Sequence, residues 1–347
     1  MADNHGSIPF LHRSSRVSER LNLSIMSAVY DRVQALMDGR VRIEGCDHTF
    51  MTAGHEQMFF RAFETAEYDI AELSMGSYIT AVARGENKYV AIPVFLSRIF
   101  RHSAIYYNAD AGISSPADLI GKKMGVPEYQ MTAALWARGF LDDEYGVSPN
   151  MMHWFQGGLD EPGRYEKVPL TLPSGTKFDT IAPDKTLDAM LVSGEIDALI
   201  SARTPKSFSS GSPNVKRMFP DYPAAEKAYY AKTKVFPIMH VVGIRRELVD
   251  KHPWLPNAVF DAFCAAKDFA VDWFSNVAAL RVTLPWFDAQ LDETKRLMGP
   301  NFWPYGISAN KKTLSLMLDY SYRHGLTDRL LTLEDLFAPS TFVEVKV

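Results

Sequence analysis

Short apolar runs alternate with amphipathic segments along most of the chain. Runs such as Leu21–Val29, Tyr68–Leu73 and Ile196–Ser201 have the length and composition of buried strands. Segments such as His55–Ala66 and Gln130–Tyr145 instead repeat their apolar residues at helical spacing. This alternation predicts an α/β fold in which helices cover both faces of parallel sheets.

The same alternation continues until the last third of the chain, which is mainly helical. Further strands are predicted over Tyr89–Leu96, Ala104–Tyr107, Met124–Val126 and Val235–Ile244, and further helices over Thr186–Val192, Asn257–Ser275, Asp288–Met298 and Lys311–His324. Between them, Gly157–Pro183 is rich in glycine, proline and polar residues. We interpret it as a long ordered loop of the kind that often serves a site.

Length and charge narrow the class of protein. A chain of 347 residues predicts two lobes rather than one small domain. A net charge of −4 and a pI near 6.2 provide no basic field, so nucleic acid is not an expected partner. Cys46 and Cys264 are interpreted as buried thiols of a reducing compartment. Without an apolar run of 18 residues, we expect a cytoplasmic protein with no membrane partner.

The densest group of candidate site residues lies between two predicted strands. In such folds ligands bind at the carboxyl ends of strands. There, Arg98, Arg101 and His102 combine guanidinium groups suited to a carboxylate with an imidazole that can transfer a proton. In an extended segment, Arg98 and His102 would point to one face and Arg101 to the other. A solvated junction paired with nearby carboxylates is an equally good interpretation.

Other candidates follow other predicted strands. Ser77 and Tyr78 come after one strand, and Glu128 and Thr132 after another, where the free N–H groups of a following helix favour anions. An ordinary helix cap is the commoner role for such serine and threonine residues. Glu72, which precedes one of these loops, and Glu128 could each act as an acid or base, although a surface carboxylate is the commoner role. Arg164, close to the glycine pair Gly157-Gly158, is a weaker candidate.

Two candidates lie later in the chain, and the usual cofactor motifs are missing. Arg203 follows Ile196–Ser201, where a lobe-to-lobe ion pair is the alternative, and His240 lies in an apolar strand, where a core histidine is the alternative. The dinucleotide and P-loop glycine patterns are missing, and no histidine follows His55-Glu56 at zincin spacing. We therefore predict no cofactor, and no ligand spacing supports a metal site.

Nine segments carry a resemblance to a known family, and they occur in order over most of the chain. They are YDRVQALMDGRV (30–41), IAELSMGSY (70–78), VAIPVFLSRIFRHSAIYYN (90–108), GKKMGVPEYQMTAALWARG (121–139), GEIDALISAR (194–203), RMFPDY (217–222), VFPIMHVVGIR (235–245), LMGPNFWPYG (297–306) and DLFAPS (335–340). In these segments the chain resembles the 4,5-dihydroxyphthalate decarboxylase family.

The resemblance implies a two-lobed α/β fold like that of the type II periplasmic binding proteins, with an anion in the cleft between the lobes. On this chain it implies a polar N-terminal extension over residues 1–20, a first part of lobe 1 over 21–103, lobe 2 over 104–234, and a return to lobe 1 over 235–347. The two chain crossovers would bring the candidate residues to one cleft.

The resemblance also implies an enzyme, a carboxy-lyase of phthalate catabolism. It would release CO2 from 4,5-dihydroxyphthalate and leave 3,4-dihydroxybenzoate, with the ring as its own electron sink and no organic cofactor. A non-catalytic binding protein for a small aromatic carboxylate, or a decarboxylase of a different hydroxybenzoate, are the alternatives. A homo-oligomer is compatible with the sequence.

From this chemistry we assign provisional roles to the candidate residues. Arg98, Arg101 and Arg203 would anchor carboxylates. His102 would transfer protons, with His240 as the second candidate. The expected further substrate contacts are Ser77, Tyr78, Glu128 and Thr132.

Overall fold

The structure is a computed structural model that describes residues 20–275 and 278–342. The extension predicted over residues 1–20 lies outside the described part, apart from its last residue. The strands are β1 (Leu21–Met26), β2 (Cys46–Met51), β3 (Ile70–Ser74), β4 (Tyr89–Arg98), β5 (Ile105–Asn108), β6 (Lys123–Val126), β7 (His153–Gln156), β8 (Lys177–Thr180), β9 (Ala198–Ile200), β10 (Val215–Arg217) and β11 (Ile238–Arg245). The α-helices are α1 (Asp31–Met37), α2 (His55–Thr65), α3 (Met75–Ala83), α4 (Thr132–Tyr145), α5 (Leu187–Ser193), α6 (Lys206–Ser209), α7 (Tyr222–Thr233), α8 (Arg246–Lys251), α9 (Leu255–Phe274), α10 (Phe287–Met298), α11 (Lys311–Arg323) and α12 (Leu333–Leu336).

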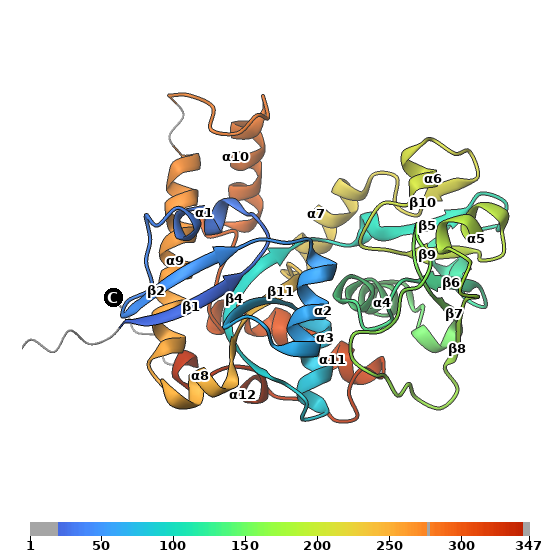
Figure 1. Ribbon diagram of the computed structural model, residues 1–347. Coiled ribbons are helices and arrows are strands. Elements are labelled where there is room, and N and C mark those ends of the chain that lie inside the picture. The colour runs from blue at the N-terminus through green and yellow to red at the C-terminus, as the bar shows by residue number, and fades with distance from the viewer. Residues whose placement is uncertain (1–19, 276–277, 343–347) are drawn as a thin grey trace, which may run out of the picture.

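The strands form two sheets, which Figure 1 shows as two halves of the molecule. The first sheet has the order β2-β1-β3-β11-β4 and the second the order β10-β5-β9-β6-β7-β8. We call the first sheet with its helices lobe 1 and the second lobe 2. The chain passes between them after β4 and again before β11. The lobe boundaries predicted at 103–104 and 234–235 fall within these two connections.

Both sheets are mixed, so the prediction of parallel sheets holds for only some of the strand pairs. β11 runs antiparallel to β3 and β4, and β5 runs antiparallel to β9 and β10. Alternation of strands and helices along the sequence does not reveal a strand that returns from the other lobe. β11 enters the middle of the first sheet, with its register against β4 shifted around His240. This insertion places His240 opposite Ser74 of β3 and Ser97 of β4.

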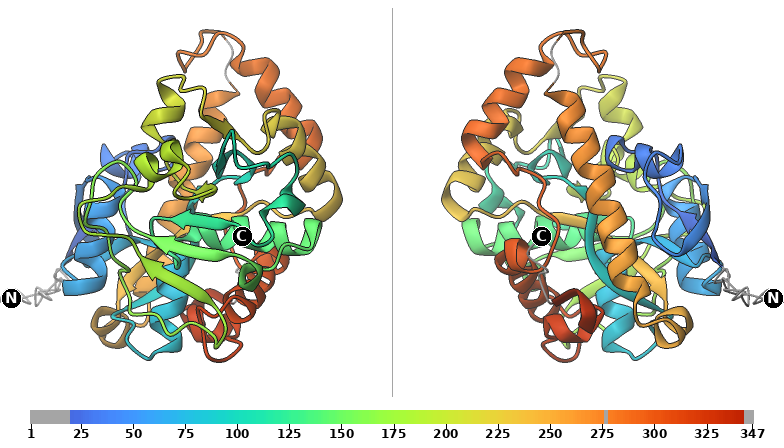
Figure 2. Two further views of the ribbon diagram at one scale, coloured as in Figure 1. Left: turned by 90° about the vertical axis from the view of Figure 1, so that its right-hand side faces the viewer. Right: turned by 90° about the vertical axis from the view of Figure 1, so that its left-hand side faces the viewer.

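Helix α4 packs at the junction of the two lobes. Trp136 of α4 donates a hydrogen bond to the carbonyl of Ile238 at 2.8 Å. Gly139 lets α11 approach closely, because a Cβ there would lie 2.1 Å from the ring of Tyr320. Gly76 of α3 likewise faces the segment just before α4. The N-terminus of α4 is thereby held between the lobes, while the C-terminal end of α9 projects from the body together with α10 (Figure 2).

Several short elements were not predicted. β8 lies inside the segment that was expected to be a loop. The sequence did not reveal this strand, because its side chains are mostly exposed and show no apolar run. α7 buries only Tyr229, so it lacks the apolar stripe from which helices are recognised. Within the described residues, no helix is both long and apolar enough to cross a membrane.

The first crossover buries His102, which was predicted to line the cleft. The chain turns through a 3-10 helix at His102–Ala104, and the imidazole stacks on Phe140 with ring centroids 4.2 Å apart. Phe219 and Tyr229 pack against its edges. Only 3% of His102 is exposed, and burial lowers its pKa to about 4. The predicted cleft position of His102 is therefore wrong, because the turn directs the ring into an aromatic cluster.

This burial makes a prediction about pH and stability. Because the pKa of His102 is lower in the folded than in the unfolded protein, the unfolded chain takes up a proton that the folded one refuses. The stabilisation is complete above pH 6.5 and is lost as the pH falls towards about 4. Within this range, protonation of the unfolded chain at His102 should lower the free energy of unfolding by up to about 1.4 kcal/mol per pH unit. In denaturant unfolding of His102→Phe, the contribution of His102 to this slope should be missing; an unchanged slope, or an imidazole of His102 titrating near 6.5 by NMR, would contradict it.

Candidate active site

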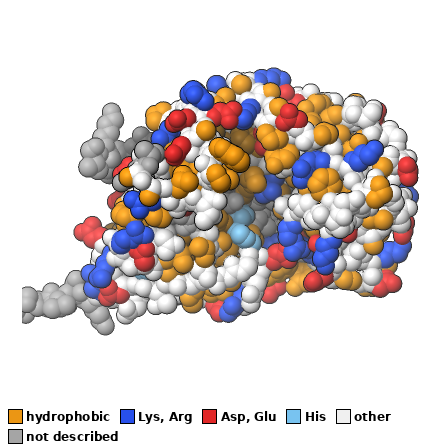
Figure 3. Space-filling model, turned by 90° about the horizontal axis from the view of Figure 1, so that it is seen from above, with side chains coloured by type: hydrophobic (Ala, Val, Ile, Leu, Met, Phe, Trp, Pro, Cys, Tyr) orange, Lys and Arg blue, Asp and Glu red, His pale blue; other side chains and the backbone are white. Residues whose placement is uncertain are grey.

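A cleft of about 700 Å³ lies between the lobes. Figure 3 shows the hollow with histidine side chains in it and lysine or arginine side chains along one side. Lobe 1 and the crossover contribute Tyr30, His55, Glu56, Phe59, Ser74, Ser97, Arg98, Arg101 and His240, and lobe 2 contributes Pro127, Met131, Thr132, Ala133, Leu159, Arg164, Lys167, Ser201 and Arg203. Most of these residues follow the ends of strands or begin helices.

A buried carboxylate, Glu72 of β3, lies behind the lobe 1 wall. Its Oε2 accepts hydrogen bonds from the N–H of Ala28 at 2.9 Å and the hydroxyl of Ser27 at 3.0 Å. Its Oε1 accepts from the Tyr30 hydroxyl at 2.7 Å and lies 2.6 Å from Nδ1 of His240. Burial alone would raise the pKa of Glu72, but His240, Tyr30 and Ala28 together lower it to about 2. Glu72 is therefore an ionised carboxylate with its acceptor positions filled.

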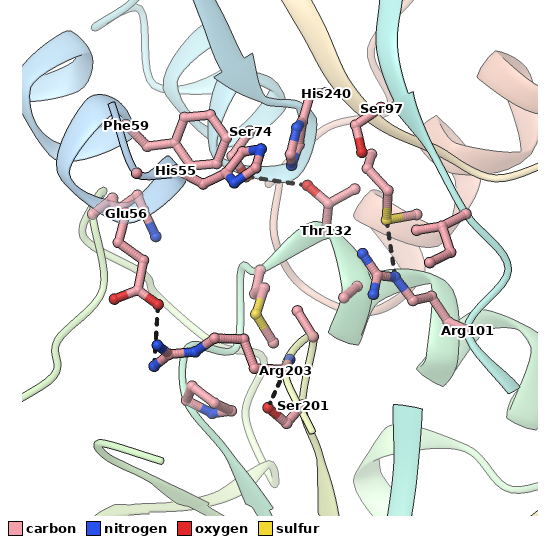
Figure 4. Close-up of a pocket in the computed structure, with 18 of the residues that line it drawn as sticks. His55, Glu56, Phe59, Ser74, Ser97, Arg101, Thr132, Ser201, Arg203 and His240 are labelled. Atoms are coloured by element: carbon pink, nitrogen blue, oxygen red, sulfur yellow. Dashed lines mark hydrogen bonds and ion pairs between the residues drawn. The ribbon is translucent and has the colours of Figure 1, made fainter. Parts of the chain in front are cut away.

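This carboxylate orients two imidazoles at the cleft. Because Nδ1 of His240 donates to Glu72, the neutral ring presents Nε2 as an acceptor. Burial lowers the pKa of His240 and so favours the neutral form, although Glu72 opposes that effect. His55 at the start of α2 has its Nε2 2.8 Å from the Tyr30 oxygen, and its ring centroid lies 5.2 Å from that of His240. Figure 4 shows the two rings on the same side of the pocket.

The same three residues could hold a metal ion. One ligand atom from each of His55, Glu72 and His240 lies within 4.8 Å of the others, and two imidazoles with one carboxylate are a common metal-binding set. Their separation in the sequence showed no ligand spacing, so this trio was not predicted. However, a metal would have to replace the proton between His240 and Glu72, where the hydrogen bonds are already complete.

On the same side as His240, Arg101 of the first crossover provides a positive charge for an anion. Its Nε donates to the sulfur of Met239 at 3.1 Å, and no carboxylate among the described residues forms an ion pair with it. Burial lowers the pKa of Arg101 to about 10, so the group stays charged at neutral pH. Thr132 and Ala133, the first residues of α4, also line the cleft and direct the start of a 14-residue helix towards it. Arg101 and this N-terminus form a site suited to a carboxylate.

Lobe 2 adds a second cationic group from the loop between β7 and β8. Arg164 and Lys167 both pair with Glu128, which is completely buried. The prediction that Glu128 reaches the cleft is therefore wrong, because its two oxygens face these cations instead of the cleft. Glu128 holds Arg164 and Lys167 at the wall. Leu159, Arg164 and Lys167 of this long loop line the cleft, so the expectation that the loop serves the site stays a prediction.

Arg203 lies in the cleft, and it also forms the lobe-to-lobe ion pair considered as its alternative. Its Nη2 is 3.3 Å from Oε1 of Glu56, the second residue of α2. The same oxygen is 2.5 Å from Nη1 of Arg164. Glu56 therefore joins lobe 1 to two arginines of lobe 2.

Three further predicted residues serve the fold rather than the cleft surface. Arg98 borders the cleft, but its guanidinium donates to the Phe236 and Pro304 carbonyls and to the side chain of Asn310. The hydroxyl of Tyr78 donates to the carbonyl of Leu336 at 2.6 Å, and Ser77 is fully buried against Ser74. Tyr78 and Ser77 do not line the cleft, because their side of α3 packs into the core.

Of the predicted residues, the structure brings Arg101, Thr132, Arg203 and His240 together at the cleft, with Arg98 at its border. Sequence reasoning did not single out Tyr30, His55, Glu56 or Lys167, and it treated Glu72 and Arg164 as weak candidates. The only sequence signal for Glu72 was a carboxylate at the end of an apolar strand. A buried polar residue at that position requires partners, but the sequence does not name them.

Comparisons with known proteins identify the family. The chain is 45% identical over 328 residues to a 4,5-dihydroxyphthalate decarboxylase of Comamonas testosteroni, covering 94% of this chain and 99% of that one. It is 45% identical over 218 residues to a 4,5-dihydroxyphthalate decarboxylase of Pseudomonas putida, covering 63% of this chain and 84% of that one.

Two other comparisons concern the fold. Residues 24–176 match the family model described as ABC transporter, phosphonate, periplasmic substrate-binding protein. The periplasmic aliphatic sulphonate binding protein SsuA of Escherichia coli superposes with a TM-score of 0.50 at 14% identity, covering 92% of each chain. The predicted two-lobed fold of the type II periplasmic-binding-protein class is thereby confirmed. The 45% identity to the relative of Comamonas testosteroni, over nearly the whole of both chains, establishes that the chain belongs to the 4,5-dihydroxyphthalate decarboxylase family.

Proposed function

We propose that the protein converts 4,5-dihydroxyphthalate to 3,4-dihydroxybenzoate and CO2. The observation that carries this proposal is the two-sided cleft, in which Arg164, Lys167 and Arg203 of lobe 2 face a histidine pair held by a buried carboxylate in lobe 1. The proposed substrate has the same two-sided character, because its carboxylates occupy one edge of the ring and its hydroxyls the opposite edge. The anionic edge fits the cationic wall, and the hydroxyl edge fits the histidines.

His240 is the proposed base for the hydroxyl group. Its Nε2 accepts the proton of the hydroxyl that lies para to the departing carboxylate, while Glu72 accepts a hydrogen bond from Nδ1. The charge of Glu72 stabilises the imidazolium that forms, as the buried carboxylate of a catalytic triad does. The ionised oxygen then supplies electron density to the ring carbon that bears the departing carboxylate.

The bond changes balance without an oxidant or a reductant. The ring carbon takes up a proton that comes ultimately from solvent, and its bond to the carboxylate breaks. The electron pair of that bond restores the aromatic ring, CO2 leaves, and His240 returns its proton to the oxygen. Arg101 and the N-terminus of α4 hold the carboxylate that remains.

The cellular setting belongs to the same proposal. We place the reaction in phthalate breakdown in the cytoplasm, as the names of the relatives and the free thiols Cys46 and Cys264 support. Of the two, Cys46 is buried as expected and Cys264 is partly exposed. We also keep a homo-oligomer as a proposal.

The direct test is incubation of the purified protein with 4,5-dihydroxyphthalate, with and without a chelator. We expect 3,4-dihydroxybenzoate and CO2 in equal amounts, and metal analysis of the same sample counts bound ions. Tight binding without CO2 release would overturn the proposal in favour of a solute-binding protein. One metal per chain, with activity lost on chelation, would replace the proton transfer by His240 with a metal at His55, Glu72 and His240.

Removal of the proposed base should slow turnover while sparing binding. His240→Asn should lower kcat roughly 10²- to 10⁴-fold, the usual effect of losing a general base. Calorimetry with phthalate, which lacks the reacting hydroxyls, should give an affinity close to wild type. The matched control is His102→Phe, which should retain turnover because that ring is buried away from the cleft. A kcat near wild type for His240→Asn would exclude His240 as the base.

The two neighbouring arginines should respond differently to the same substitution. Arg101→Lys keeps the charge but loses the planar fork, so KM should rise roughly tenfold with little change in melting temperature. Arg98→Lys should instead lower the melting temperature, because Arg98 binds two carbonyls and Asn310. Kinetics and thermal unfolding of both variants provide the comparison. A normal KM for Arg101→Lys would show that Arg101 is not the carboxylate anchor.

A further inference from the structure

Among the described residues that line the cleft, Glu56 is the only carboxylate, and it reaches across the cleft. It lies in the first turn of α2 in lobe 1, and its Oε1 binds Arg164 and Arg203 of lobe 2 at 2.5 and 3.3 Å. Figure 4 shows its pairing with Arg203 at the edge of the pocket. A negative charge therefore occupies part of the wall that is expected to receive a substrate anion.

The two arginines depend on Glu56 to different degrees. Arg164 has a second carboxylate partner in the buried Glu128. Arg203 has no other ion pair within the described residues, and its side chain is 61% exposed. Of these two arginines, Arg203 is thus the one that a substrate carboxylate can more easily take over, and in doing so it would displace Glu56.

This competition changes during a decarboxylation. A carboxylate bound at Arg203 lies close to the like charge of Glu56, which opposes its binding. When that carboxylate becomes neutral CO2, the repulsion disappears and Arg203 can pair with Glu56 again. An interaction that weakens the bound substrate but not the transition state lowers affinity and raises kcat.

We propose that Glu56 is a specificity-determining residue that competes with the departing carboxylate for Arg203. The inference rests on the proposed decarboxylation and goes beyond it by assigning the departing carboxylate to Arg203 and the retained one to Arg101. Glu56 disfavours the bound dicarboxylate and favours its conversion to a monocarboxylate. After CO2 leaves, the restored Glu56–Arg203 pair prevents the product from gaining a second anchor.

The position of Glu56 next to His55 dictates a conservative test. Loss of the whole side chain could shift the first turn of α2 and with it His55, whose Nε2 contacts Tyr30. Glu56→Gln keeps the shape and removes only the charge. The matched control is Glu67→Gln, which removes the same charge from an exposed pair with Arg61 outside the cleft lining.

The experiment measures binding and turnover separately. For Glu56→Gln, calorimetry should show phthalate binding roughly three- to tenfold tighter than in wild type, the range expected for losing a partly exposed like charge. Binding of the monocarboxylate 3,4-dihydroxybenzoate should change less than about twofold, because Arg101 holds it. With 4,5-dihydroxyphthalate, KM and kcat should both fall. Glu67→Gln should match wild type in all three measurements.

Clear results would overturn the inference. Phthalate binding that is unchanged or weaker in Glu56→Gln would contradict the competition, as would a lower KM with an unchanged kcat. Equal tightening for phthalate and 3,4-dihydroxybenzoate would place the retained carboxylate, not the departing one, at Arg203. The binding measurements do not require turnover, so wild-type protein that binds phthalate but releases no CO2 would refute the proposed function while the phthalate comparison still decides whether Glu56 competes.

Discussion

The buried charge of Glu72 is the constraint on which the arrangement of His240 and His55 at the cleft depends. A carboxylate removed from water is costly unless donors surround it, and here the donors come from the segment after β1, from Tyr30 and from His240 of β11. Each donor is thereby fixed in position. Meeting the needs of one buried group therefore orients His240 and, through Tyr30, also His55. The orientation of the two histidines in the cleft wall therefore follows from a requirement of the fold.

The lobe 2 wall of the cleft presents cations whose buried carboxylate partner does not face the cleft. Glu128 is buried behind Arg164 and Lys167, so it holds both cations in the cleft wall while facing away from the cleft. Arg101 differs, since a methionine sulfur holds its Nε and no described carboxylate pairs with it. The lobes thus bring an unpaired guanidinium close to oriented imidazoles. A binding protein needs only the first of these features, whereas proton transfer needs both.

Much of the fold could be predicted from local pattern, and the site only in part. The strands β3 and β4 and the helices α2 and α4 were recognisable because their apolar residues repeat at the proper spacing. The direction in which each side chain points was harder to predict from the sequence. The alternation expected along this segment ends where the chain turns through the 3-10 helix at His102–Ala104. Arg101 lines the cleft, whereas Arg98 binds carbonyls and His102 packs on aromatic rings. These directions depend on tertiary packing that the sequence does not show.

By itself, the sequence determined the two-lobed α/β class, the family and the types of residue available for binding an acid, because these depend on composition, periodicity and long matching segments. Only the tertiary structure decided which of those residues meet. Glu72 and His240 are separated by 168 residues, and their contact exists because β11 returns to pair with β3 in one particular register. A shift of one residue would turn His240 to the other face of the sheet. That register is set by the packing of the whole lobe, and no local pattern near either residue records it.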